Sequence, residues 1–73
     1  MSRRTNLIKA RKENSLTQSS IARSVGITKQ QYQRLEAGTS RGSVKVWQRL
    51  SELLKQPADF LWQQEDTLQG EEI

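Results

Sequence analysis

The 73-residue sequence contains no cysteine and no histidine, and this excludes several kinds of chemistry. Disulfides, thiolate nucleophiles, imidazole bases and the usual zinc ligands are all missing. No apolar run approaches the roughly 18 residues of a membrane-spanning helix, and the first residues lead into no apolar stretch of the signal-peptide type. We therefore expect one small domain, soluble and cytoplasmic, that is not an enzyme and uses no cofactor or metal.

Apolar residues are also few, at 33% of the chain, with only 5% aromatic residues. A domain of this size hides only about 60% of the surface that its unfolded chain exposes, so its core is thin. Dimerisation would be a natural source of additional stability.

Charge is abundant but unevenly distributed. The 12 basic residues lie between Arg3 and Lys55, where only three acids oppose them, and the net charge of that stretch is +9. Residues 56–73 carry five acids and no base, a net charge of −5. This asymmetry indicates a polyanion-binding domain over residues 1–62 and an acidic, disordered tail over 63–73. A basic surface with no partner is the alternative.

Period-2 alternation is absent, and Gly26, Gly38, Gly42 and Pro57 divide the chain into helix-length pieces. The sequence therefore predicts an all-α fold, a compact bundle of about five short helices. These helices are expected over residues 4–13, 18–25, 28–37, 43–55 and 57–62.

Several polar residues mark the ends of these helices. Thr17 and Ser43 are predicted N-caps, and the T-x-x-Q pattern of Thr28 and Gln31 predicts a capping box. Asn14 is expected to end the first helix, because asparagine tolerates the left-handed conformation found at helix ends.

Apolar side chains at helical spacing predict the core. Trp47 and Phe60 follow the apolar stripes of the last two helices and are expected to be buried, with Leu16 also entering the core.

Residues 18–35 have the spacing of a helix-turn-helix. Two short helices that cross steeply need a small residue at their contact, which Ala22 supplies. The sharp turn between them needs a positive φ, which Gly26 adopts without steric cost.

The run L-T-Q-S-S-I-A-R-S-V-G-I-T-K-Q-Q-Y-Q-R-L-E-A-G, residues 16–38, resembles the phage repressor and Cro type of DNA-binding domain, also called the XRE family. The resemblance covers about residues 5–62 and implies a lambda-repressor-like fold. It also implies a transcriptional repressor that binds a near-palindromic double-stranded DNA operator as a homodimer, with the third helix in the major groove. The sequence departs from the family pattern at five positions. Asn14 and Lys55 stand where Gly is common, and Ser20 stands where Glu is common. Gly42 stands where Pro is frequent, and Tyr32 where a β-branched residue is usual.

A projection of the third helix at 100° per residue separates two faces. Tyr32, Leu35 and Glu36 share one side, and the opposite side is polar and free of acid. Glutamine can bind the adenine edge, and arginine or lysine the guanine edge. We predict that the base-reading residues are Lys29, Gln30 and Arg34, with Gln33 and Thr28 as weaker candidates. An ordinary solvated helix face is the alternative.

Phosphate contacts are predicted at two helix starts and the loop between the third and fourth helices. The candidates are Thr17, Gln18, Thr39, Ser40, Arg41, Ser43 and Lys45. Arg3 and Arg4 could reach phosphates as an N-terminal arm or form a mobile basic tip. Ser19, Ser20 and Arg23 are expected on the solvated side of the second helix.

The resemblance also implies a structural ion pair and a set of dimer-contact residues. Arg11 and Glu36 match a pair that supports the fold of the family, so we expect a structural ion pair rather than a DNA contact. The family dimerises through its last two helices, and the candidates for that contact are Gln56, Pro57, Ala58 and Trp62.

Two other functions stay open at this point. The acidic tail could dock on a protein partner, as in an antitoxin that also autoregulates its operon. Residues 63–73 also have the composition of a linker, so the chain could be the DNA-binding piece of a longer regulator.

Overall fold

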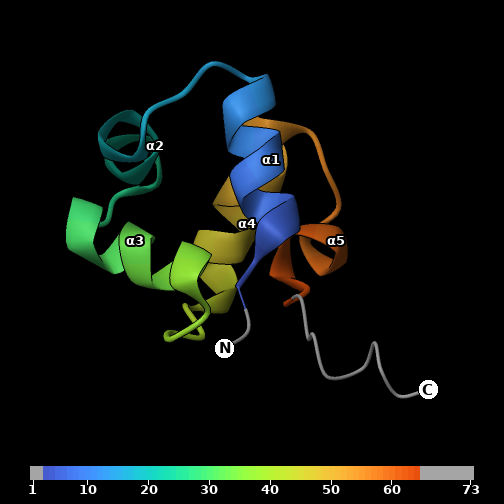
Figure 1. The fold of residues 1–73 in the computed structure, drawn as a ribbon. Helices are drawn as coiled ribbons and strands as arrows, with labels where there is room; N and C mark the ends of the chain where they lie inside the picture. The colour runs from blue at the N-terminus through green and yellow to red at the C-terminus, as the bar shows by residue number, and fades with distance from the viewer. Residues whose placement is uncertain (1–2, 65–73) are drawn as a thin grey trace.

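The computed structural model describes residues 3–64, and this part of the chain folds into five short α-helices (Figure 1). They are α1 (Thr5–Glu13), α2 (Gln18–Val25), α3 (Lys29–Ala37), α4 (Val44–Leu54) and α5 (Ala58–Trp62). The predicted all-α fold is confirmed. Of the predicted tail, residues 65–73 lie outside the described residues.

The starts of α2, α3 and α4 are capped by hydroxyl groups, as predicted. Thr28 Oγ1 accepts from the backbone N–H of Gln31, whose side chain accepts from the Thr28 N–H in return. Thr17 forms the same reciprocal box with Ser20, at 3.0 and 3.2 Å. Ser20 is therefore half-buried in a cap and does not lie on the solvated face where it was expected.

The end of α1 differs from the prediction. Asn14 does follow the last helical residue, but its φ is −95° and the left-handed residue is Ser15, with φ 57°. The Asn14 side chain instead donates to the Ala10 carbonyl at 2.8 Å. The Ala10 carbonyl thus accepts from both the side chain and the backbone N–H of Asn14, and the reversal of the chain takes place one residue later.

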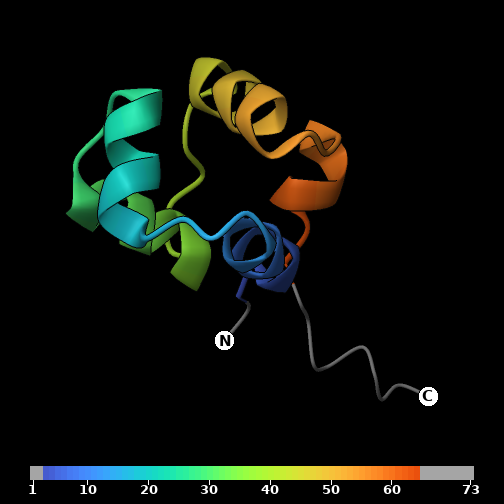
Figure 2. The ribbon, with the colours of Figure 1, turned by 90° about the horizontal axis from the view of Figure 1, so that it is seen from above.

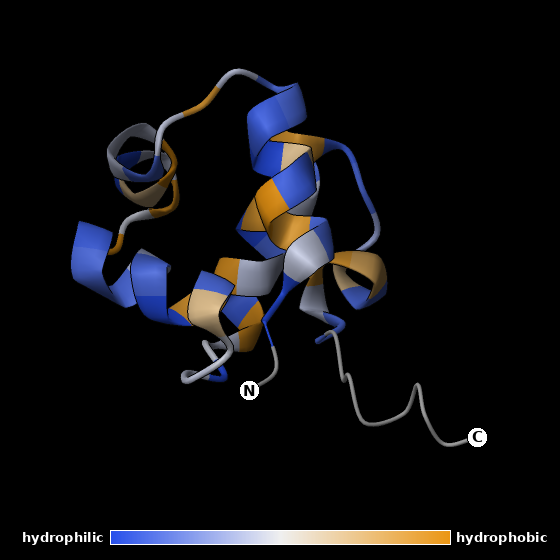
Figure 3. Ribbon diagram, viewed as in Figure 1, coloured by the Kyte–Doolittle hydropathy of each residue, from blue (hydrophilic) through white to orange (hydrophobic). Residues whose placement is uncertain are grey.

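The helices form two groups that close over one core. Helix α2 packs mainly against α3, whereas α1 and α4 both pack against α5 (Figure 2). The hydrophobic faces point inward between these groups (Figure 3). The buried apolar residues are Leu7, Ala10, Ile21, Ala22, Val25, Tyr32, Leu35, Trp47, Leu50, Leu54 and Leu61, with Leu16 partly buried against them.

The two aromatic residues expected in the core have different outcomes. Trp47 is 5% exposed, which confirms its prediction, but Phe60 is 37% exposed, so its prediction was wrong. Helix α5 has only five residues, and Leu61, fully buried, occupies its inward position. Because neighbouring residues of a helix point about 100° apart, burying Leu61 turns Phe60 toward the surface.

Tyr32 is fully buried, and its hydroxyl makes no hydrogen bond within the described residues. Burial, together with the nearby Glu36 carboxylate, raises the pKa of this phenol. In the unfolded chain the Tyr32 phenol ionises at about pH 10, whereas in the native state it stays protonated above that pH. The native state therefore binds more protons than the unfolded state above about pH 10. The stability contribution of Tyr32 is present below pH 10 and falls by about 1.4 kcal/mol per pH unit above it.

We expect the Tyr32→Phe variant to be as stable as the parent at pH 7 or more stable by up to about 1 kcal/mol, because it removes a buried group without a partner. The variant should also lose less stability than the parent between pH 10 and 11. Urea unfolding at pH 7, 10 and 11 measures both effects. Equal losses in the two proteins above pH 10 would contradict the assignment to Tyr32.

Candidate nucleic-acid interface

Helix α3 has one buried face and one exposed face. Tyr32, Leu35 and Glu36 are buried, as the projection predicted. The exposed residues are Lys29, Gln30, Gln31, Gln33 and Arg34, with Thr28 also exposed at the N-cap. Glu36 is the only acid of α3, and because it is buried the outer face carries long polar and basic side chains with no opposing charge. The N-terminal half of α3 is correspondingly hydrophilic in Figure 3.

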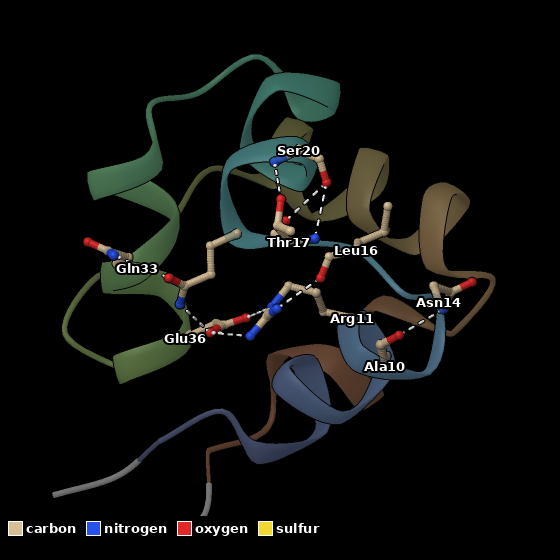
Figure 4. Close-up of polar contacts among 9 residues, drawn as sticks. Ala10, Arg11, Asn14, Leu16, Thr17, Ser20, Gln33 and Glu36 are labelled. Carbon is tan, nitrogen blue, oxygen red and sulfur yellow. Dashed lines mark hydrogen bonds and ion pairs between the residues drawn. The ribbon is translucent and has the colours of Figure 1, made fainter.

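The buried carboxylate of Glu36 joins three helices (Figure 4). Arg11 Nε of α1 donates to Glu36 Oε2 at 2.6 Å, and the Arg11 Nη1 donates to the Leu16 carbonyl at 2.9 Å. The hydrogen bond to Glu36 raises the pKa of the Arg11 guanidinium. This is the contact expected for a structural ion pair, and it fixes α1 against α3.

The same carboxylate also holds the start of α2. Gln18 Nε2 donates to Glu36 Oε1 at 2.9 Å, and Gln18 Oε1 accepts from Gln33 Nε2 at 3.2 Å. The carboxamide of Gln33, on the exposed face of α3, is thereby oriented by a chain of hydrogen bonds that begins in the core. No sequence pattern predicts this link, since positions 18 and 33 carry no motif that pairs them.

The loop of residues 38–43, between α3 and α4, lies next to the C-terminal end of α3. Thr39 donates its N–H to the Arg34 carbonyl, and the Ser40 and Arg41 carbonyls accept from Arg4 Nη1 and Trp47 Nε1. The Arg41 side chain is exposed. Ser43 caps α4 through the Val46 N–H, and Lys45 is exposed in the first turn of that helix. Arg41 of the loop and Lys45 of α4 are therefore two exposed cations that follow α3 closely in the chain.

Arg4 does not form the arm that the sequence suggested. It is 2% exposed and donates through Nη1 to the Leu35 carbonyl at 2.7 Å. Arg3, next to it, is exposed. Only Arg3 of this pair can contact a phosphate, because a guanidinium enclosed by carbonyl groups is not accessible to DNA.

Apolar side chains are exposed around α5 and the start of α4. Val44 is 74% exposed and Trp62 40% exposed, and both line a groove together with Trp47. Gln56 and Ala58, expected in a dimer contact, are half-buried, and Pro57 is exposed. Helix α5 lies on the side of the molecule away from α2 (Figure 1).

A protein-family model described as Helix-turn-helix matches residues 7–61. The chain belongs to this family, the phage repressor and Cro type of helix-turn-helix proteins. A search of curated proteins found no match to the chain. The family consists of DNA-binding transcription regulators and is not an enzyme family. The helix-turn-helix protein is therefore a DNA-binding regulator, in which α2 and α3 form the motif itself.

Within residues 3–64 of this helix-turn-helix protein, no helix is long and apolar enough to cross a membrane. The same residues contain no group of three or more acids placed to hold a metal ion.

Proposed function

We propose that the protein is a transcriptional repressor that binds a near-palindromic operator as a homodimer, with α3 of each subunit in the major groove. The observation that carries this proposal is the exposed face of α3, which has long polar and basic side chains and no acid. The proposed base contacts are Lys29, Gln30 and Arg34, with Gln33 and Thr28 as secondary contacts.

The proposed phosphate contacts surround this face. They are Thr17, Gln18, Thr39, Ser40, Arg41, Ser43 and Lys45. Thr17 and Gln18 stand at the start of α2, where the positive end of the helix dipole favours a phosphate. The Gln18 carboxamide is engaged by Glu36 and Gln33. We expect the Gln18 carboxamide to orient Gln33 on the interface as well as to contact the DNA backbone.

The proposed dimer contact uses Gln56, Pro57, Ala58 and Trp62. The exposed rings of Phe60 and Trp62 support this assignment, since aromatic side chains are enriched at the centre of interfaces. A two-fold dimer places its recognition helices on one face of the duplex when the half-site centres are about 10 base pairs apart.

Selection of bound duplexes from a random DNA library tests the proposal, with the full 73-residue chain at near-physiological salt. We expect enrichment of a two-fold symmetric motif with half-sites one helical turn apart. An asymmetric single half-site would contradict the homodimer. Failure to enrich any motif would contradict sequence-specific repression by this chain alone, and would favour a protein partner or a longer regulator.

Substitutions on α3 and in the loop are expected to have different consequences. Gln30→Ala or Arg34→Ala should cost about 1–3 kcal/mol of binding free energy and relax the preference at particular base pairs. Arg41→Ala should weaken binding to all sequences alike and reduce the salt dependence by about one phosphate contact. Binding measured against the selected site and its single-base variants distinguishes them. A uniform loss from Gln30→Ala would refute its role as a base reader.

A further inference from the structure

Arg4 has an environment unlike that of any other basic residue among residues 3–64. Its guanidinium lies 5.1 Å from the centre of the Trp47 ring and 4.8 Å from that of Trp62. The two rings meet edge to face, with centroids 5.4 Å apart. A buried cation is costly unless hydrogen bonds or ring faces compensate for lost water, and both are present at this site.

The hydrogen bonds of Arg4 connect parts of the chain that are distant in sequence. Nη1 donates to the Leu35 carbonyl at 2.7 Å and to the Ser40 carbonyl at 2.8 Å. Nε donates to the Trp62 carbonyl at 3.0 Å, at the end of α5. One guanidinium therefore ties the last turn of α3 and the loop of residues 38–43 to the end of α5.

Trp47 completes the attachment of this loop. Its Nε1 donates to the Arg41 carbonyl at 2.7 Å, so two successive loop carbonyls, those of Ser40 and Arg41, are held from inside. Both carbonyls accept hydrogen bonds from buried side chains, whereas Arg41 itself is exposed.

Neither Arg4 nor Trp62 falls within residues 7–61, which the family model matches. The attachment therefore depends on residues at the two ends of this domain, outside the part that defines the family. Arg4 is also too deeply buried to contact DNA itself.

We propose that Arg4 is a positioning residue for DNA binding: with Trp47 it holds the loop of residues 38–43 in the conformation that presents Arg41 to a backbone phosphate. This inference rests on the proposed function, since it assumes that the loop contacts phosphate.

The test compares Arg4→Lys with Arg23→Lys, a substitution of an exposed arginine near the end of α2, and neither substitution changes the charge of the chain. Lysine has all its donors on one nitrogen atom, so it cannot donate from two separate nitrogens and lie flat against rings as arginine does. Circular dichroism first establishes a temperature at which each full-length variant is folded. Affinity for the selected operator is then measured over a series of salt concentrations, with and without Arg41→Ala.

We expect Arg4→Lys to bind roughly three- to tenfold more weakly near physiological salt, with a salt slope lower by about 0.9, the value for one lost phosphate contact. Arg23→Lys should bind like the parent. In the Arg41→Ala background, Arg4→Lys should have almost no further effect, because the contact that it positions is already gone.

Parent-like affinity and salt slope for folded Arg4→Lys would overturn the inference and leave the proposed function intact. An undiminished effect in the Arg41→Ala background would overturn it as well. If Arg4→Lys does not fold, Trp47→Phe replaces it, since phenylalanine keeps a ring but cannot donate to the Arg41 carbonyl; parent-like binding would again refute the positioning role. Absence of salt-dependent DNA binding by the parent would refute the proposed function, and the inference with it.

Discussion

Replacing Glu36 with alanine is expected to lower the free energy of unfolding by about 3–5 kcal/mol. The side chain of Glu36 is only 5% exposed and that of Arg11 only 12% exposed. Removing the carboxylate leaves the largely buried Arg11 guanidinium with one hydrogen-bond partner among the described residues, the Leu16 carbonyl. It also removes the hydrogen bond from Gln18 Nε2, so the start of α2 keeps only the Gln33 contact as a side-chain link through Gln18 to α3.

Urea unfolding of Glu36→Ala measures this loss, with Glu13→Ala as the control. Glu13 is exposed at the end of α1, and its removal should change stability by less than about 0.5 kcal/mol. The double variant Arg11→Met with Glu36→Leu should regain much of the loss, because no unpaired charge then remains buried. A loss below about 1 kcal/mol for Glu36→Ala would show that the pair contributes little to the fold.

Replacing Gly42 with alanine is expected to cost about 2–5 kcal/mol of unfolding free energy. Gly42 has a φ of +71°, and a left-handed conformation costs an alanine roughly 1–2 kcal/mol. A Cβ atom at this position would lie 2.8 Å from both Leu35 Cδ2 and Trp47 Nε1. Overpacking of two buried side chains adds about 1–3 kcal/mol, and it disturbs the indole that holds the Arg41 carbonyl.

Gly26→Ala is the matched control for Gly42→Ala. Its φ is +82°, so the cost of the backbone conformation is similar. The nearest atom to its Cβ would be Arg49 Nη1 at 3.2 Å, the end of a flexible side chain that can move aside. Thermal unfolding should therefore show a clearly larger loss for Gly42→Ala, and equal losses would contradict the steric argument. Proline, frequent in the family at this position, cannot adopt the positive φ.

The helix boundaries could be predicted because they depend on local chemistry. Thr17, Thr28 and Ser43 cap the helices that follow them, because a side-chain oxygen two or three residues before a free N–H can always reach it. The exposed face of α3 could be predicted from helical periodicity, because the angle between successive residues is enough to assign each side chain to one face of the helix.

The predictions that failed concern contacts between distant segments or very short elements. Arg4 has the sequence context of a flexible basic arm, yet three carbonyl groups and two indole rings enclose it. Phe60 lies in a helix too short for periodicity to indicate which side is buried.

The sequence by itself determined the five helices, their caps and the polar face of α3, because each depends on interactions within a few residues. The tertiary structure alone decided that Gln18 orients Gln33 through Glu36, and that Arg4 holds the loop beside α3. These contacts join positions 15 to 58 residues apart. Such pairs become neighbours only when the apolar faces of the helices have packed together, because long-range hydrogen bonds need a geometry that no local pattern encodes.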